Sequence, residues 1–138
     1  MTLTLKPAFT LTVDLAEPRD VGQVPTGHRR VIPILGGTVT GPTLTGEILP
    51  GGADWNLVRP DGAIHVWARY ELRTAEGAVV SVINEGLGRP GEPIPTRPVF
   101  EVPSPGPTWL AASFFLGELR LSDRPGRVHI AVSQVIPA

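Results

Sequence analysis

The sequence predicts an all-β protein, a closed antiparallel β-barrel of about eight or nine strands. Three observations predict it. Apolar and β-branched residues alternate with polar ones at a period of two, and 16 glycines and 16 prolines punctuate these segments. The connections are also too short for the crossovers that parallel strands need. Because a closed sheet leaves no exposed edge, we expect closure rather than a sandwich, with residues 1–138 in a single domain.

In the first half of the chain, the strand at 9–15 has the clearest alternation, with apolar residues at every second position. Residues 16–26 lack any such pattern and are expected to form a loop. Pro33 cannot donate a ladder hydrogen bond, so the strand at 29–35 is expected at a sheet edge, at a bulge or as two short pieces. Short strands at 38–40, 44–49 and 54–58 follow, separated by glycine and proline turns.

In the second half, turns at 60–62 and 74–77 bracket a strand at 63–72, and another strand follows at 78–84. The stretch 86–98 holds four prolines and three glycines and is expected to be a long irregular loop, either a lid, a subunit contact or a surface loop without a role. Strands are expected at 99–102, 109–121 and 128–136. A strand is favoured over a helix at 109–121 because adjacent phenylalanines and turn residues flank a short apolar run.

Charge and composition exclude several functional classes. With 12 Lys+Arg against 13 Asp+Glu and no run of like charges, we expect neither a nucleic-acid partner nor a membrane surface. The N-terminus lacks a secretory pattern, so a cytoplasmic protein that begins at Met1 is expected. There is no cysteine, and His28, His65 and His129 are isolated, so no metal is expected. Dinucleotide, Walker and nucleophile-elbow motifs are missing, so no cofactor is expected.

A string of short motifs resembles the bacterial family called domain of unknown function 3237. The motifs are GGADW at 51–55, DG at 61–62, ARY at 68–70, EGA at 76–78 and PVFE at 98–101. The resemblance implies a calycin-type closed barrel similar to plant allene oxide cyclase. Two positions depart from the family pattern: Trp67 replaces a residue that is often acidic, and Ala111 replaces one that is often Asn. These departures imply a more hydrophobic pocket.

The strand at 63–72 has one apolar face and one mixed face, and alternation alone leaves open which face points into the barrel. If the mixed face points inward, Arg69 can hold a carboxylate or polarise a carbonyl beside Trp67. Asp54 follows a tight glycine turn, so it either caps backbone amides or, if it faces a pocket, becomes a general base whose pKa is raised by burial. Glu101 is a second candidate acid and Glu47 a third.

The function expected from these residues is a cofactor-free isomerase, lyase or cyclase that binds an apolar or acidic small molecule. The expected catalytic residues are Asp54, Arg69 and Glu101, and the expected pocket walls are Trp55, Trp67, Tyr70 and Trp109. A small-ligand carrier or sensor without catalysis remains an alternative, as does a structural barrel that assembles into an oligomer. A homo-oligomer is expected in any case, because residues 109–116 form an apolar run.

Overall fold

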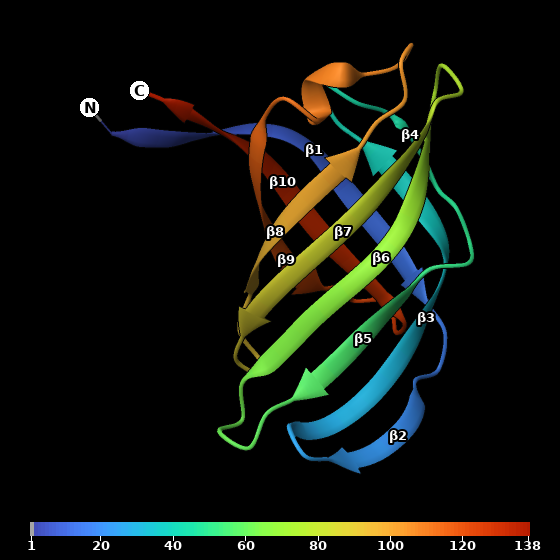
Figure 1. The fold of residues 1–138 in the computed structure, drawn as a ribbon, viewed down its shortest axis with the longest axis vertical. Coiled ribbons are helices and arrows are strands. Elements are labelled where there is room, and N and C mark those ends of the chain that lie inside the picture. The colour runs from blue at the N-terminus through green and yellow to red at the C-terminus, as the bar shows by residue number, and fades with distance from the viewer. Residues whose placement is uncertain (1) are drawn as a thin grey trace.

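The computed structural model describes residues 2–138, which form ten β-strands and one short 3-10 helix. The elements, in chain order, are β1 (Leu3–Leu15), β2 (Arg19–Val24), β3 (Gly27–Thr40), β4 (Gly46–Ile48), β5 (Ala53–Val58), β6 (Ile64–Thr74), β7 (Val79–Gly88), β8 (Ile94–Glu101), η1 (Thr108–Leu110), β9 (Phe114–Leu121) and β10 (Arg127–Pro137). Figure 1 shows these strands tilted around a common axis. The predicted all-β class is confirmed.

The sheet closes into a barrel. Its strands follow the order β1-β10-β9-β8-β7-β6-β4-β3, every pair is antiparallel, and β1 pairs again with β3 to complete the ring. Two strands are additional. β5 follows β4 in the same position between β3 and β6, without pairing to it, and β2 extends the sheet along β3. The expected closed antiparallel barrel is therefore confirmed, with eight positions in the ring.

The prediction of a loop at 16–26 is wrong, because Arg19–Val24 form β2. This strand pairs with β3 from the Arg19–Val31 pair to the Val24–Gly27 pair. Most of its side chains are exposed on both faces. Backbone pairing rather than burial holds β2 in place, so it needs no apolar alternation and leaves no pattern in the sequence.

The predicted long loop at 86–98 is also wrong. β7 continues to Gly88 and β8 begins at Ile94, so the connection is a short hairpin turn. β8 contains Pro95 and Pro98, and each of them lacks a pairing partner on one side. Pairing of β8 with β7 spans Thr96–Glu101, and pairing with β9 spans Ile94–Thr96. Pro95 thus lies outside the first ladder and Pro98 outside the second, and a missing N–H is tolerated at such positions.

Two further expectations hold in part. Pro33 lies within one continuous strand, β3, rather than between two pieces, and the β1 ladder shifts register beside it, at the Leu15–Ile34 pair. The predicted strand at 109–121 begins at Phe114, because Trp109 and Leu110 belong to η1.

One end of the barrel is filled by aromatic side chains. Phe9, Phe100 and Phe115 pack with ring centroids 5.3 to 6.2 Å apart, and Trp109 lies 5.8 Å from Phe115. Phe115 is 1% exposed, and aromatic rings in such edge-to-face contacts fill space efficiently. The interior of the barrel is therefore filled at this end.

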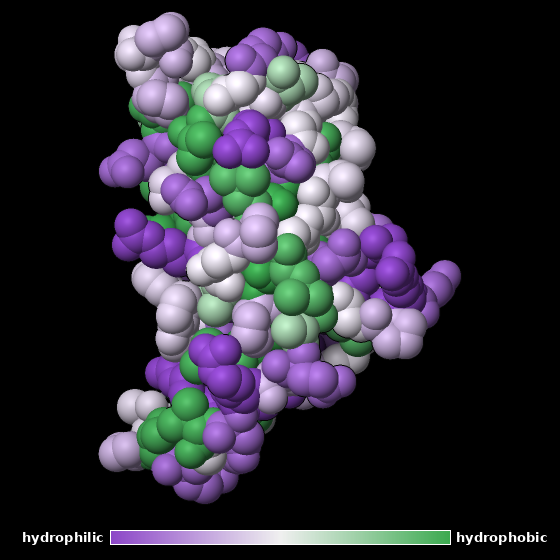
Figure 2. Space-filling model, turned by 90° about the vertical axis from the view of Figure 1, so that its right-hand side faces the viewer, coloured by the Kyte–Doolittle hydropathy of each residue, from purple (hydrophilic) through white to green (hydrophobic). Residues whose placement is uncertain are grey.

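The two chain ends leave the barrel together as a two-stranded ribbon (Figure 1), in which the Leu3–Pro137 and Leu5–Val135 pairs join β1 to β10. On the side of the molecule drawn in Figure 2, hydrophobic groups are interrupted by hydrophilic side chains. Within residues 2–138, no helix has the length and apolar character that a membrane crossing requires.

Candidate functional site

The end of the barrel opposite the aromatic cluster is hollow. A cavity of about 190 Å³ opens there, and its walls are mostly aliphatic. Its volume exceeds the roughly 150 Å³ in which an engineered apolar cavity binds benzene, so a molecule with one ring fits. The lining residues are Val13, Leu15, Arg30, Ile32, Ile34, Asp54, Asn56, Ile64, Val66, Ala68, Tyr70, Asn84, Ile94, Leu119, Leu121, Val128 and Ile130.

Asp54 is positioned by an interruption between β5 and β6. The two strands pair at Asp54–Ala68 and again at Leu57–His65, and the ladder is interrupted between these pairs. There the Asp54 carboxylate replaces a backbone acceptor: its Oδ1 receives a hydrogen bond of 3.0 Å from the backbone N–H of Trp67. Asp54 therefore caps one backbone amide and also lines the cavity, which combines the two roles that the sequence left open.

A short chain of hydrogen bonds orients the other oxygen of Asp54. Asn56 Nδ2 donates to Asp54 Oδ2 at 3.2 Å, and Arg30 Nη2 donates to Asn56 Oδ1 at 3.1 Å. Burial is the largest influence on Asp54 and raises its pKa, while the bonds from Trp67 and Asn56 and the charge of Arg30 partly oppose this effect. A carboxyl group with a raised pKa exchanges protons more readily near neutral pH than an exposed aspartate.

Two further polar side chains line the cavity with part of their hydrogen-bonding capacity unused. Tyr70 is 3% exposed and Asn84 is 1% exposed, and among the described residues the Tyr70 O–H has no acceptor and Asn84 Oδ1 has no donor. Burial raises the pKa of Tyr70 well above its ordinary value, and a hydrogen bond from the Asn84 side chain partly offsets this effect, so the phenol stays neutral. Buried polar atoms are usually satisfied, so these two oxygens need an explanation.

Of the three expected catalytic residues, only Asp54 lines the cavity. Arg69 and Glu101 are exposed and lie on the outer face of the barrel, because they alternate with the buried residues Ala68, Tyr70 and Phe100. The apolar face of β6 thus points inward. The structure does not bring Asp54, Arg69 and Glu101 together.

The four aromatic residues expected to line one pocket lie in three different parts of the protein. Tyr70 lines the cavity, whereas Trp55 and Trp67 contact each other on the outer face with ring centroids 5.8 Å apart. Trp55 and Arg69 share a shallow outer recess of about 240 Å³. Trp109 lies at the filled end. Because Trp67 faces outward and Ala111 is exposed beside η1, neither departure from the family pattern alters the cavity.

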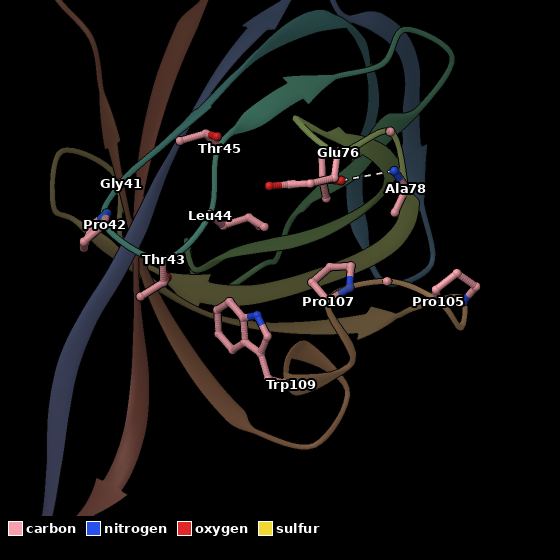
Figure 3. Close-up of a pocket in the computed structure, with 13 residues that line it drawn as sticks. Gly41, Pro42, Thr43, Leu44, Thr45, Glu76, Ala78, Pro105, Pro107 and Trp109 are labelled. Atoms are coloured by element: carbon pink, nitrogen blue, oxygen red, sulfur yellow. Dashed lines mark hydrogen bonds between the residues drawn. The ribbon is translucent and has the colours of Figure 1, made fainter.

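A wider pocket of about 730 Å³ lies at the filled end, between the loops around 41–45, 74–78 and 105–109. Figure 3 shows its residues, with Trp109 and Pro107 facing the loop that carries Leu44 and Thr43. Its one charged residue, Glu76, is exposed, and Thr74 Oγ1 is already bonded to the backbone N–H of Ala78 at 3.1 Å. The pocket offers a ligand little fixed polar chemistry, so the smaller cavity is the stronger candidate.

The histidines and the third candidate acid are engaged elsewhere. His28 pairs with Asp20, His65 Nε2 lies 2.8 Å from Glu85 Oε2, and His129 Nδ1 lies 3.1 Å from Thr12 Oγ1. Glu47 Oε1 accepts a hydrogen bond of 3.2 Å from Arg73 on the outer surface. No group of three potential metal ligands occurs within the part of the chain that the structure describes.

Sequence reasoning missed Arg30, Asn56 and Asn84. Arg30 lies on β3, within the strand predicted at 29–35, but no functional role was predicted for it from the sequence. The available signal was the two-residue alternation itself. It places Asn56 on the same face of β5 as Asp54, and Asn84 on the same inward face of β7 as Val80 and Val82.

Comparison with known proteins gives the family and the fold. A family model described as "Protein of unknown function (DUF3237)" matches residues 3–97. A UPF0311 protein of Rhodopseudomonas palustris is 38% identical, and one of Bradyrhizobium diazoefficiens is 36% identical, each alignment covering 98% of both chains. Among solved structures, a conserved protein of unknown function from Rhodopseudomonas palustris is 37% identical with a TM-score of 0.88, covering 99% of both chains.

Two other solved structures have the same fold. A β-barrel-like protein from Acinetobacter baumannii is 29% identical with a TM-score of 0.86, covering 99% of this chain and 98% of the other. A structure described as an enzyme from Penicillium herquei is 18% identical with a TM-score of 0.80, covering 99% and 96%, and this likeness concerns the fold alone. The resemblance inferred from the motifs is thus confirmed, and the chain belongs to the DUF3237 family of proteins of unknown function.

Proposed function

We propose that the protein binds a small, largely apolar molecule in the cavity at the hollow end of the barrel and transfers a proton on it through Asp54. The reaction belongs to the cofactor-free class of isomerisations, water losses and cyclisations, which need a base, a stabiliser for developing negative charge and a site that excludes water. Asp54 supplies the base, and the aliphatic walls of the cavity keep bulk water away.

One observation carries this proposal: a buried carboxylate lines an otherwise aliphatic cavity. A structural aspartate in such a place is normally enclosed by donors, whereas Asp54 accepts one bond from Trp67 and one from Asn56. A carboxylate can accept about four hydrogen bonds, so lone pairs remain for a ligand. The raised pKa of Asp54 also suits a group that takes up and returns a proton near neutral pH.

Arg30 provides the cationic group that the sequence assigned to Arg69. Its Nη2 donates to Asn56, while its Nε is buried and has no partner in the described part of the chain. An acidic group on the ligand, or a negative charge that develops during proton transfer, can bind at this nitrogen. The chain from Arg30 through Asn56 also keeps Asp54 oriented, so the base needs little rearrangement on ligand binding.

The test is hydrogen–deuterium exchange of cyclohexanone and 2-cyclohexenone in D2O, followed by proton NMR. The wild-type protein is expected to accelerate loss of the α-proton signal, and D54N to lower the rate about 100-fold or more. E101Q is the matched control, because it replaces an exposed carboxylate by an amide and should leave the rate unchanged. An equal rate in wild type and D54N contradicts the proposal.

A carrier without catalysis is the second candidate. It is favoured by the fact that both oxygens of Asp54 already have protein partners, which suits a purely structural carboxylate. If this candidate is correct, the protein binds cyclohexanone saturably, D54N binds it as well, and neither protein exchanges its α-protons.

A further inference from the structure

We propose that Tyr70 and Asn84 form an oxygen-binding site in the floor of the cavity, which recognises a neutral hydroxyl or enol group on a ligand with one ring. This inference rests on the proposed function, because it names the class of molecule on which Asp54 would act. Both residues line the cavity and are almost completely buried, and within residues 2–138 the Tyr70 O–H has no acceptor and Asn84 Oδ1 has no donor.

The sheet register places Asn84 in the same row as Asp54, two strands away. Asp54 on β5 pairs with Ala68 on β6, and Ala68 pairs with Asn84 on β7. Adjacent strands are about 4.8 Å apart, so the backbones of Asp54 and Asn84 are separated by roughly 10 Å. The methyl group of Ala68 is the only side chain between them in this row, which leaves space for a ligand. Tyr70 lies two residues farther along β6, toward the filled end.

The chemistry of the two oxygens is complementary to a hydroxyl group. The neutral Tyr70 hydroxyl can donate a hydrogen bond to a ligand oxygen, and Asn84 Oδ1 can accept one from a ligand O–H. A ketone satisfies only the Tyr70 donor, whereas an enol or a phenol satisfies both groups. Because a buried group without a partner is costly, the site is expected to bind an enol more tightly than its ketone.

In an enolisation, the parts of the site take distinct roles. Asp54 removes a proton from the carbon next to the carbonyl, the C–H electron pair forms the C=C bond, and the carbonyl π pair moves to oxygen. Tyr70 donates its hydrogen bond to that oxygen as the charge develops. The proton on Asp54 is then returned to carbon or passed to oxygen, so no oxidant, reductant or further reactant is consumed.

Phenol and toluene, which have nearly the same shape and differ in the hydroxyl group, are the probes that test the site. Titrations followed by ¹⁵N NMR at the amides of Ala68 and Val82 give both dissociation constants. Wild type is expected to bind phenol more tightly than toluene, and Y70F is expected to reduce that preference about fivefold. Since the Tyr70 O–H has no acceptor in the described chain, Y70F should change the unfolding temperature little.

The matched control is T96V. Thr96 Oγ1 is likewise buried without a partner among residues 2–138, but Thr96 is not part of the cavity wall, so this variant should keep the preference. Equal affinity for the two probes in wild type, or an unchanged preference in Y70F, overturns the inference. If either result occurs while exchange still depends on Asp54, the proposed function stands and only the oxygen site is wrong. If neither probe binds and the exchange rate is the same in wild type and D54N, both proposals are overturned.

Discussion

Asp54 and Asn84 lie in one row of the sheet, on either side of Ala68. The small side chain of Ala68 therefore separates the base from the proposed oxygen site. A68L is expected to place three further carbon atoms in the cavity, and it should weaken binding of phenol and cyclohexanone at least tenfold by occupying the space that the ring needs. NMR titration measures this effect. A68S, which adds a single atom, is the control, and an affinity in A68L equal to that of wild type would show that the ligands bind elsewhere.

The burial of Asp54 predicts a pH-dependent stability. Its pKa is raised above the ordinary value of 3.8, so the folded state holds the proton more tightly than the unfolded state. Its stabilising contribution is complete below pH 3.8 and is lost as the pH rises through the raised folded pKa. Urea unfolding between pH 4 and pH 7 is therefore expected to show D54N becoming more stable relative to wild type as the pH rises.

The comparison with D54N isolates this group. Asp14 and Glu85 have lowered pKa values because of hydrogen bonds from Arg127 and His65, so they change stability with pH in the opposite direction. They are present in both proteins, and their contribution cancels in the difference. A difference between wild type and D54N that stays constant from pH 4 to pH 7 would contradict a raised pKa at Asp54.

The two ends of the barrel are expected to respond differently to mutation. Phe115 is buried against Phe9, Phe100 and Trp109 at the filled end, so F115A should lower the free energy of unfolding by about 3–5 kcal/mol. At a temperature where the variant is folded, phenol affinity should stay near the wild-type value. V99A is the control: Val99 is 59% exposed and lies on the outer face of the barrel, and its loss should change stability little. A large loss of phenol affinity in F115A would show that the two ends are not independent.

The expected homo-oligomer remains a prediction, and the outer face offers a test of it. Leu5, Val135 and Phe114 are register neighbours across β1, β10 and β9, and Phe114 and Leu5 are more than half exposed. Exposed apolar groups in a continuous row are typical of contacts between subunits. F114S is therefore expected to reduce the molar mass measured by light scattering. An unchanged molar mass contradicts a contact through this row.

The fold was largely predictable because each strand of a closed barrel buries one face, so apolar and polar residues alternate along its sequence. Residues 9–15 and 63–72 show this alternation clearly, and both lie in strands with a buried face. β2 escaped prediction because backbone pairing alone holds it. The first half of β8 escaped because its prolines resemble a loop when the ladders around them are unknown, whereas its second half was predicted as the strand at 99–102. These two features depend on neighbours that are distant in the sequence.

The site was less predictable than the fold. Asp54 was identified, but Arg69 and Glu101 lie outside the barrel, since the sequence pattern shows that β6 has two faces without showing which one is enclosed. Trp67 and Tyr70 are on opposite faces of the same strand, so alternation alone excludes a pocket that both of them line. Asn84 was not identified because its position beside Ala68 and Asp54 depends on how β5, β6 and β7 pair. That pairing is not visible in the sequence of any one strand.

The most direct test of the central claim is a crystal structure of the protein with phenol. The account predicts phenol in the cavity at the hollow end, with its oxygen within hydrogen-bond distance of Tyr70 Oη and its ring against Ala68 and Val66. Phenol bound only at the outer surface or in the pocket beside η1, with none in the cavity near Asp54, would contradict it.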